Sequence, residues 1–158
     1  MNFELTDKQI EALEYMKSGK SVFLTGPAGT GKSFLLKYYI FWYEVNRMND
    51  KAKIFITSTT GLSAILINGM TINRFAGIGI ADKDVDYYYK RVIRMPALRK
   101  RWCDTKVLII DEISMMDAEM FDKLETLARK VRKSTKPFGG IQVILSGDFL
   151  QLKPVSSD

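Results

Sequence analysis

The chain has 158 residues, 46% of them hydrophobic and 27% charged, with a formal net charge of +6, which is typical of one globular domain. It has no histidine and a single cysteine, Cys103, so an internal disulfide, a histidine general base and zinc sites built from histidine or cysteine alone are excluded. No apolar run approaches the ~18 residues of a membrane span. We expect a soluble intracellular protein. Its positive charge suits a polyanionic partner, although a basic surface that is merely solvated would explain the charge as well.

Short apolar runs alternate with helical patterns along the chain. The helical patterns cover residues 6–18, 33–47, 61–67 and 117–133, and the apolar runs cover residues 22–25, 54–58, 107–110 and 141–145. This alternation predicts an α/β fold, a mostly parallel sheet with helices on both faces. We expect the strand at 22–25 to be buried on both faces, and residues 81–101 to form an irregular or helical insertion between strands.

A glycine-rich segment follows the first apolar run. It comprises Gly26, Pro27, Ala28, Gly29, Thr30, Gly31, Lys32 and Ser33, and it fits the phosphate-binding P-loop pattern. The glycines allow backbone amides to point at phosphate oxygens, Lys32 adds a charge for the terminal phosphates, and the Ser33 hydroxyl can bind Mg²⁺. The segment predicts a nucleotide site, against the alternative of a flexible turn before an ordinary helix.

An acidic pair ends the third apolar run. Asp111 and Glu112 follow residues 107–110, and a buried strand delivers the residues at its end to the carboxyl edge of a parallel sheet. We expect Asp111 to hold Mg²⁺, directly or through water, and Glu112 to orient and deprotonate the attacking water. The alternative is a strand followed by two solvated acids in a turn.

A third polar segment follows the last apolar run, where Gly147 and Asp148 precede Gln151. The amide of Gln151 could touch the terminal phosphate or the attacking water and report which nucleotide is bound. Without further context, the preferred interpretation of Gln151 is an exposed loop residue.

Five segments together resemble the motor of the PIF (petite integration frequency) helicases, superfamily-one DNA helicases that translocate 5′ to 3′ on single strands. They are residues 26–33, 57–64 (Thr-Ser-Thr-Thr-Gly-Leu-Ser-Ala), 69–79 (Gly-Met-Thr-Ile-Asn-Arg-Phe-Ala-Gly-Ile-Gly), 110–117 (Ile-Asp-Glu-Ile-Ser-Met-Met-Asp) and 147–155 (Gly-Asp-Phe-Leu-Gln-Leu-Lys-Pro-Val). The resemblance implies a RecA-like P-loop NTPase that uses ATP and Mg²⁺ and binds single-stranded DNA and DNA forks. It also implies a role in DNA repair, recombination or telomere maintenance.

The resemblance carries roles onto single residues. Gln9 matches the glutamine that reads adenine ahead of the P-loop, although Thr6 and Gln9 also form a capping-box pattern, and both uses could coexist. The segments that match the family's single-stranded DNA contacts include Thr57, Ser58, Thr60, Gly61, Thr71, Asn73 and Phe75. Hydroxyls and glycine amides there could grip phosphates, and Phe75 could stack on a base. The alternative is a strand-to-helix turn with a core phenylalanine.

Two features depart from the family pattern. Asn73 stands where the family usually has histidine, so it can form a hydrogen bond but cannot stack as an imidazole does. The chain stops just after Val155, whereas in the family a second RecA-like domain follows and supplies the arginine that completes the ATP site. We therefore expect a monomer that binds Mg-nucleotide but hydrolyses it poorly and unwinds nothing by itself, with the strand at 141–146 between the other two site strands.

Two other functions remain compatible with these residues. A P-loop ATPase that acts on protein would share Lys32, Asp111 and Glu112 but would have no use for residues 57–75. A truncated motor could instead serve as a nucleic-acid-binding module that does not hydrolyse ATP, which the basic residues 90–106 would suit equally well.

Overall fold

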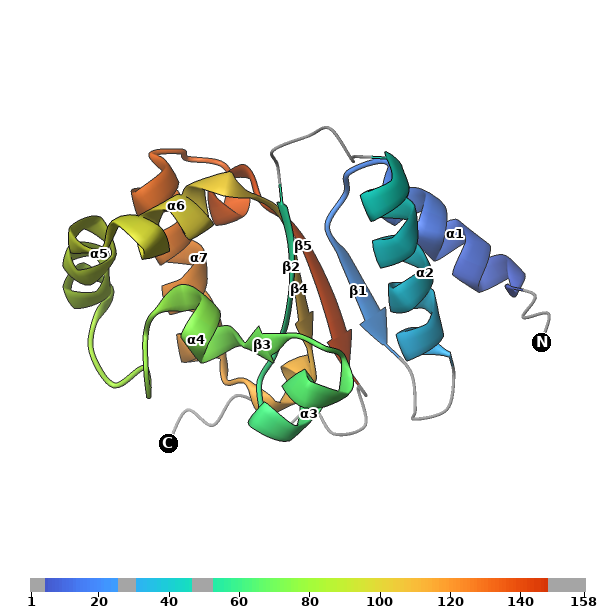
Figure 1. Ribbon diagram of the computed structural model, residues 1–158, viewed down its shortest axis with the longest axis horizontal. Coiled ribbons are helices and arrows are strands. Elements are labelled where there is room, and N and C mark those ends of the chain that lie inside the picture. The colour runs from blue at the N-terminus through green and yellow to red at the C-terminus, as the bar shows by residue number, and fades with distance from the viewer. Residues whose placement is uncertain (1–4, 26–30, 47–52, 148–158) are drawn as a thin grey trace.

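The computed structural model describes residues 5–25, 31–46 and 53–147, which form a five-stranded parallel sheet with helices on both faces (Figure 1). The strands are β1 Val22–Thr25, β2 Lys53–Ser58, β3 Met70–Thr71, β4 Thr105–Asp111 and β5 Gln142–Gly147. The helices are α1 Asp7–Lys17, α2 Lys32–Asn46, α3 Gly61–Leu66, α4 Ile72–Ala76, α5 Val85–Arg94, α6 Pro96–Asp104 and α7 Ala118–Arg132, with short 3-10 helices η1 Ile113–Met115 and η2 Pro137–Gly140. The predicted α/β fold is confirmed.

The sheet has the order β1-β5-β4-β2-β3. The last described strand, β5, therefore lies between β1 and β4, as the sequence analysis predicted. It pairs in parallel with both neighbours, so that Ile144 lies opposite Val22 on one side and opposite Ile109 on the other. All strands point the same way, and the carboxyl ends of β1, β5 and β4 meet along one edge of the sheet (Figure 1).

The central strand β4 contributes side chains to the core on both faces of the sheet. Val107 and Ile109 pack in the cluster that includes the helices α1 and α2, and Leu108 and Ile110 pack in the cluster that includes α4 to α7. Successive side chains of a strand point to opposite faces, so a continuous apolar run is what a strand covered on both sides requires. All four side chains are at most 2% exposed.

The strand β1 differs from this prediction. Leu24 is 7% exposed and packs with α1 and α2, but Phe23 on the other face is 42% exposed. The expectation that this strand is buried on both faces is therefore wrong. The physical reason is its place at the edge of the described sheet, where the opposite face receives less cover than at β4.

The insertion between β3 and β4 is helical. It forms α5 and α6, which are joined at Met95, whose extended backbone (φ −112°, ψ 95°) precedes Pro96. A residue before proline is pushed out of the helical region, and proline suits the first position of a helix, so the break between the two helices follows from the sequence. The strand β3 and the helix α4 were not predicted, since elements of two and five residues carry no readable periodicity.

None of the helices in the described part of the chain is both long and apolar enough to cross a membrane.

Arg132, at the end of α7, ties three parts of the fold together. Its Nη1 donates hydrogen bonds to the carbonyl oxygens of Trp102 (2.7 Å), Cys103 (3.0 Å) and Thr105 (3.0 Å), and its Nε donates to the carbonyl of Gly139 (2.8 Å). Partial burial lowers the pKa of the guanidinium from its ordinary value. The side chain thus fixes the end of α6 and the start of β4 against α7.

We expect Arg132→Met to lower the free energy of unfolding by about 2–4 kcal/mol, because several carbonyl groups lose a charged donor at once. Urea denaturation followed by circular dichroism measures this change. Arg94→Met is the matched control, since Arg94 is exposed and no hydrogen bond or ion pair of its side chain occurs among the described residues; its cost should stay within about 0.5 kcal/mol. Equal losses in the two variants would contradict this role for Arg132.

Candidate nucleotide and DNA site

The predicted phosphate-binding segment joins β1 to α2. β1 ends at Thr25 and α2 begins at Lys32, with Gly31 in the left-handed region (φ 84°) just before the helix. The amide of Leu35 donates to the Gly31 carbonyl at 3.0 Å, which closes the first turn. Ser33 is exposed in this turn. The predicted residues Gly26, Pro27, Ala28, Gly29 and Thr30 lie outside the described residues.

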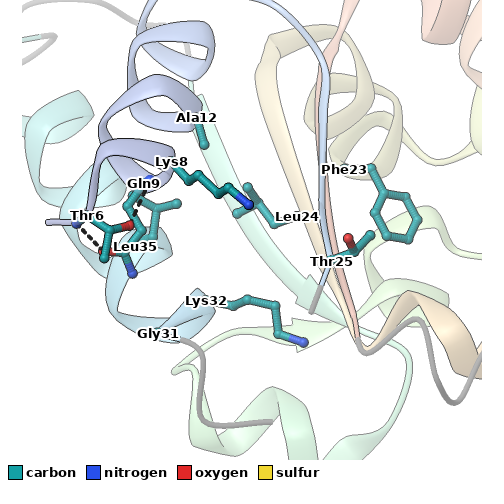
Figure 2. Close-up of a pocket in the computed structure, with 10 residues that line it drawn as sticks. All are labelled: Thr6, Lys8, Gln9, Ala12, Phe23, Leu24, Thr25, Gly31, Lys32 and Leu35. Atoms are coloured by element: carbon teal, nitrogen blue, oxygen red, sulfur yellow. Dashed lines mark hydrogen bonds between the residues drawn. The ribbon is translucent and has the colours of Figure 1, made fainter. Parts of the chain in front are cut away.

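A pocket of about 340 Å³ opens beside the start of α2. Figure 2 shows its lining, which comes from the first turns of α1, from β1 and from the start of α2, and includes Gln9, Thr25, Gly31 and Lys32. We call this candidate site the nucleotide pocket; it lies between the helix that carries Gln9 and the helix that Lys32 begins. The position is the one that the sequence analysis assigned to a nucleotide.

Of the two roles that the sequence left open for Gln9, the structure confirms the helix cap, and adenine reading stays a prediction. Its side-chain Oε1 accepts a hydrogen bond from the Thr6 amide at 2.8 Å, and its own amide donates to Thr6 Oγ1 at 3.2 Å, so the capping box is confirmed. Its side chain also lines the nucleotide pocket. A Cβ added to Gly31 would lie only 2.6 Å from Gln9 Nε2. The cap therefore holds the Gln9 amide group against the end of the P-loop, and an amide oxygen can accept a second hydrogen bond.

The acidic pair lies at the carboxyl end of β4. Asp111 is the last residue of β4 and Glu112 follows it, both partly exposed. Glu112 has a left-handed backbone (φ 57°, ψ 41°), which is uncommon for a residue with a Cβ. Two hydrogen bonds from Thr59 hold the turn: its Oγ1 donates to the Glu112 carbonyl at 2.8 Å, and its amide donates to the Asp111 carbonyl at 3.3 Å.

The strand order brings Lys32 and the acidic pair to the same edge of the sheet. β5 alone separates β1 from β4, and neighbouring strands lie about 4.8 Å apart, so the ends of β1 and β4 are roughly 10 Å apart. A lysine at one end and two carboxylates at the other match the two ends of a phosphate chain with its metal ion. Gln151 lies outside the described residues.

The donors present fit Mg²⁺. Mg²⁺ usually keeps several water ligands and takes only one or two carboxylates, together with phosphate oxygens. Ser33 and Asp111 provide a hydroxyl and a carboxylate of this kind. No group of three or more acidic, cysteine or histidine side chains able to hold a metal by itself occurs among the described residues, which a site shared with a nucleotide does not need.

Ser114 is a residue of this region to which the sequence analysis gave no role. It lies in η1, is 8% exposed, and its hydroxyl is the one buried side-chain polar atom of the described residues that has no hydrogen-bond partner. Buried hydroxyls in proteins nearly always have a partner. The η1 backbone packs closely on the end of β5: a Cβ added to Gly147 would lie 3.4 Å from the Ser114 amide.

The structure corrects part of the predicted DNA-binding set at the end of β2. Thr57 and Ser58 are 0% exposed, and their hydroxyls donate to the carbonyls of Ile109 (2.7 Å) and Asp111 (3.3 Å). The prediction that these hydroxyls grip phosphates is therefore wrong, because they pair β2 with β4. Thr60 caps α3 by accepting from the Ser63 amide at 3.2 Å, and Gly61 is exposed at the start of that helix.

In the second predicted DNA segment, too, one predicted residue is buried in the core and another caps a helix. Phe75 is 0% exposed, and its ring centroid lies 5.2 Å from those of both Phe55 and Trp102, so the prediction that it stacks on a base is wrong and the core alternative holds. Thr71 caps α4 by accepting from the Arg74 amide at 3.2 Å. Asn73 is partly exposed, and its Nδ2 donates to the Gly79 carbonyl at 2.6 Å.

Similar proteins identify the family. A helicase of Saccharomyces cerevisiae, "ATP-dependent DNA helicase PIF1", is 46% identical over 98% of this chain and 18% of its own length. The crystal structure of Pif1 helicase from Candida albicans matches with a TM-score of 0.88 and 42% identity over 98% of this chain and 34% of that chain. Pif1 of Bacteroides in complex with ADP-AlF3 and single-stranded DNA matches with a TM-score of 0.69 and 30% identity, over 99% of this chain and 35% of that chain.

The chain thus spans about a fifth of the yeast relative and about a third of the two proteins of known structure. The sequence model described as "PIF1-like helicase" matches residues 4–158. A match over nearly the whole chain, together with the same fold at 42% identity, shows that the chain belongs to the PIF1-like helicase family.

Proposed function

We propose that this chain is the nucleotide-binding motor domain of an ATP-dependent DNA helicase that translocates 5′ to 3′ on single-stranded DNA. The observation that carries the proposal is the placement of Lys32 and the Asp111–Glu112 pair at one edge of the sheet, with β5 between them. Solved relatives support it: Pif1 of Bacteroides holds ADP-AlF3 and single-stranded DNA in one structure. Another study concerns unwinding at forked DNA by two Pif1 helicases.

Each residue of the site has one task in this proposal. Gln9 binds the adenine at the rim of the nucleotide pocket, and Lys32 neutralises charge on the terminal phosphates. Ser33 and Asp111 would hold Mg²⁺, which when bound would draw charge from the phosphate oxygens. Glu112 orients a water molecule for in-line attack and accepts its proton. Positioning and charge neutralisation supply most of the catalysis in such sites.

Hydrolysis and movement require more than this chain in our proposal. A second RecA-like domain in the parent protein would supply an arginine that stabilises charge in the transition state, an effect of about 10³–10⁵ in rate. We infer that the chain by itself is a monomer that binds Mg-ATP, hydrolyses it slowly and does not unwind duplex DNA. The fuller protein would bind single strands and forks.

We expect Lys32→Ala to weaken Mg-ATP binding by about tenfold or more, because one charged contact to phosphate is lost. Glu112→Gln should bind Mg-ATP as tightly as the unchanged chain but lose its residual hydrolysis, by about 10²–10⁴ where a general base is removed. Calorimetric titration and a phosphate-release assay measure the two effects. Lys37→Ala is the control, since Lys37 is an exposed lysine of the same helix outside the nucleotide pocket.

Two results would contradict parts of this proposal, the first the nucleotide site and the second the need for a second domain. The first is an unchanged affinity in Lys32→Ala. The second is DNA-stimulated turnover of the isolated chain at the rates of a complete helicase, which would show that no second domain is needed.

We also expect the chain to bind a single-stranded oligonucleotide with an affinity that falls steeply with salt. Each phosphate contact contributes about −0.7 to the slope of log K against log salt for a single strand. Fluorescence anisotropy over a salt series gives the slope, and competition with polyglutamate tests whether bulk charge alone explains it. A chain that binds ATP but not the oligonucleotide, even at low salt, would instead favour an ATPase that acts on protein.

A further inference from the structure

A second hollow, of about 460 Å³, lies away from the nucleotide pocket, between α4, the turn after it, α5 and α6. Its lining includes Asn73 and Arg74 of α4, Arg91 of α5, Arg101 of α6 and the glycines of the turn at 77–79. We call it the arginine hollow. Three helices each contribute one guanidinium group to it, and none of the residues that line it is acidic.

The walls of the arginine hollow are built by specific contacts. Gly77 ends α4 in the left-handed region (φ 75°), and a Cβ there would collide with the side chain of Leu98. Asn73 Nδ2 holds the Gly79 carbonyl, which fixes the turn at the rim. Arg101 Nη1 donates to the carbonyls of residues 74 (3.0 Å) and 75 (3.1 Å), which anchors α6 on the end of α4. These contacts therefore fix the shape of the hollow.

The charges around the arginine hollow are not balanced. The lysines of α5 and α6 have partners, since Lys90 pairs with Asp86 at 3.2 Å and Lys100 pairs with Asp104 at 2.5 Å. Among the described residues, by contrast, no ion pair involves Arg74, Arg91 or Arg101. The dipole of α5 accounts for a basic residue in its last turn, but it does not account for arginines from three helices that line one hollow.

We infer that the arginine hollow binds phosphate groups of the nucleic-acid strand, which would continue past α4 onto α5 and α6. This inference rests on the proposed function. Guanidinium groups bind phosphate through two parallel hydrogen bonds, and spaced groups suit successive phosphates of one strand. Asn73 belongs both to the predicted DNA segment and to the hollow, so the two surfaces are continuous. The hollow therefore adds contacts to the DNA path that the family resemblance did not predict.

The test compares two double variants that remove the same charge. Arg74→Gln with Arg91→Gln removes two side chains of the arginine hollow, while Arg94→Gln with Arg99→Gln removes two exposed arginines of α5 and α6 that do not line it. Each protein is titrated with labelled oligo-dT of about 16 nucleotides, near the upper site size of small single-strand-binding folds, over a salt series. Mg-ATP binding, measured in parallel, reports whether the nucleotide pocket is intact.

We expect the hollow variant to lose about tenfold or more in affinity and its salt slope to fall by about 1.4, which corresponds to two phosphate contacts on a single strand. The control variant should keep the slope of the unchanged chain. Mg-ATP binding should stay the same in both. The single change Arg91→Glu repeats the test if the double variant does not fold, and it should weaken binding in the same direction.

Other outcomes overturn the inference. If the unchanged chain binds DNA and both double variants lose equally little, the hollow is not part of the DNA path and the proposed function stands. If the unchanged chain binds Mg-ATP but no DNA, the inference and the DNA part of the proposed function fail together. In a competition assay on the control variant, inorganic phosphate and polyglutamate are compared with unlabelled DNA at equal charge. If either displaces the labelled DNA as effectively as unlabelled DNA, the hollow is a general anion site.

Discussion

Backbone hydrogen bonding of β5 to both β1 and β4 fixes the distance between the two halves of the nucleotide site. Lys32 begins the helix after β1, and the acidic pair lies at the end of β4, so the pairing of the strands places both groups. One strand pairing more or less would move the two ends by about 4.8 Å, enough to separate a metal ligand from its phosphate. Because β4 is buried on both faces, it cannot shift its register against β5 without exposing apolar side chains.

Sequence reasoning succeeded where local chemistry and burial agree. The apolar run of β4 ends in two acids, and the glycine-rich segment follows β1, so the positions of both groups at strand ends could be predicted, while the strand order was predicted from the family resemblance. It failed where one residue type serves two purposes. Threonine, serine and phenylalanine suit a DNA surface, but Thr57, Ser58 and Phe75 are buried and hold β2, β4 and α4 together; only tertiary packing decides between these uses.

The exposed Phe23 illustrates a second limit of the sequence. An apolar run of four residues indicates a strand but does not tell whether it is central or lies at an edge. Pairing decides: β5 covers one edge of β1, and the other edge has no partner strand among the described residues. Pairing also made β3 a strand, since its two residues bond to the end of β2, which no pattern within residues 70–71 could indicate.

Two departures from relaxed structure lie at or next to the acidic pair. The strand β4 is buried from Val107 to Ile110, but within the next few residues Glu112 takes a left-handed backbone and the Ser114 hydroxyl is buried without a partner. Such features cost free energy and occur preferentially at functional sites. Thr59 offsets part of this cost by bonding to the Glu112 carbonyl, and it directly precedes Thr60, which caps α3. Two hydrogen bonds from Thr59 therefore connect the start of the predicted DNA surface with the turn that carries the proposed general base.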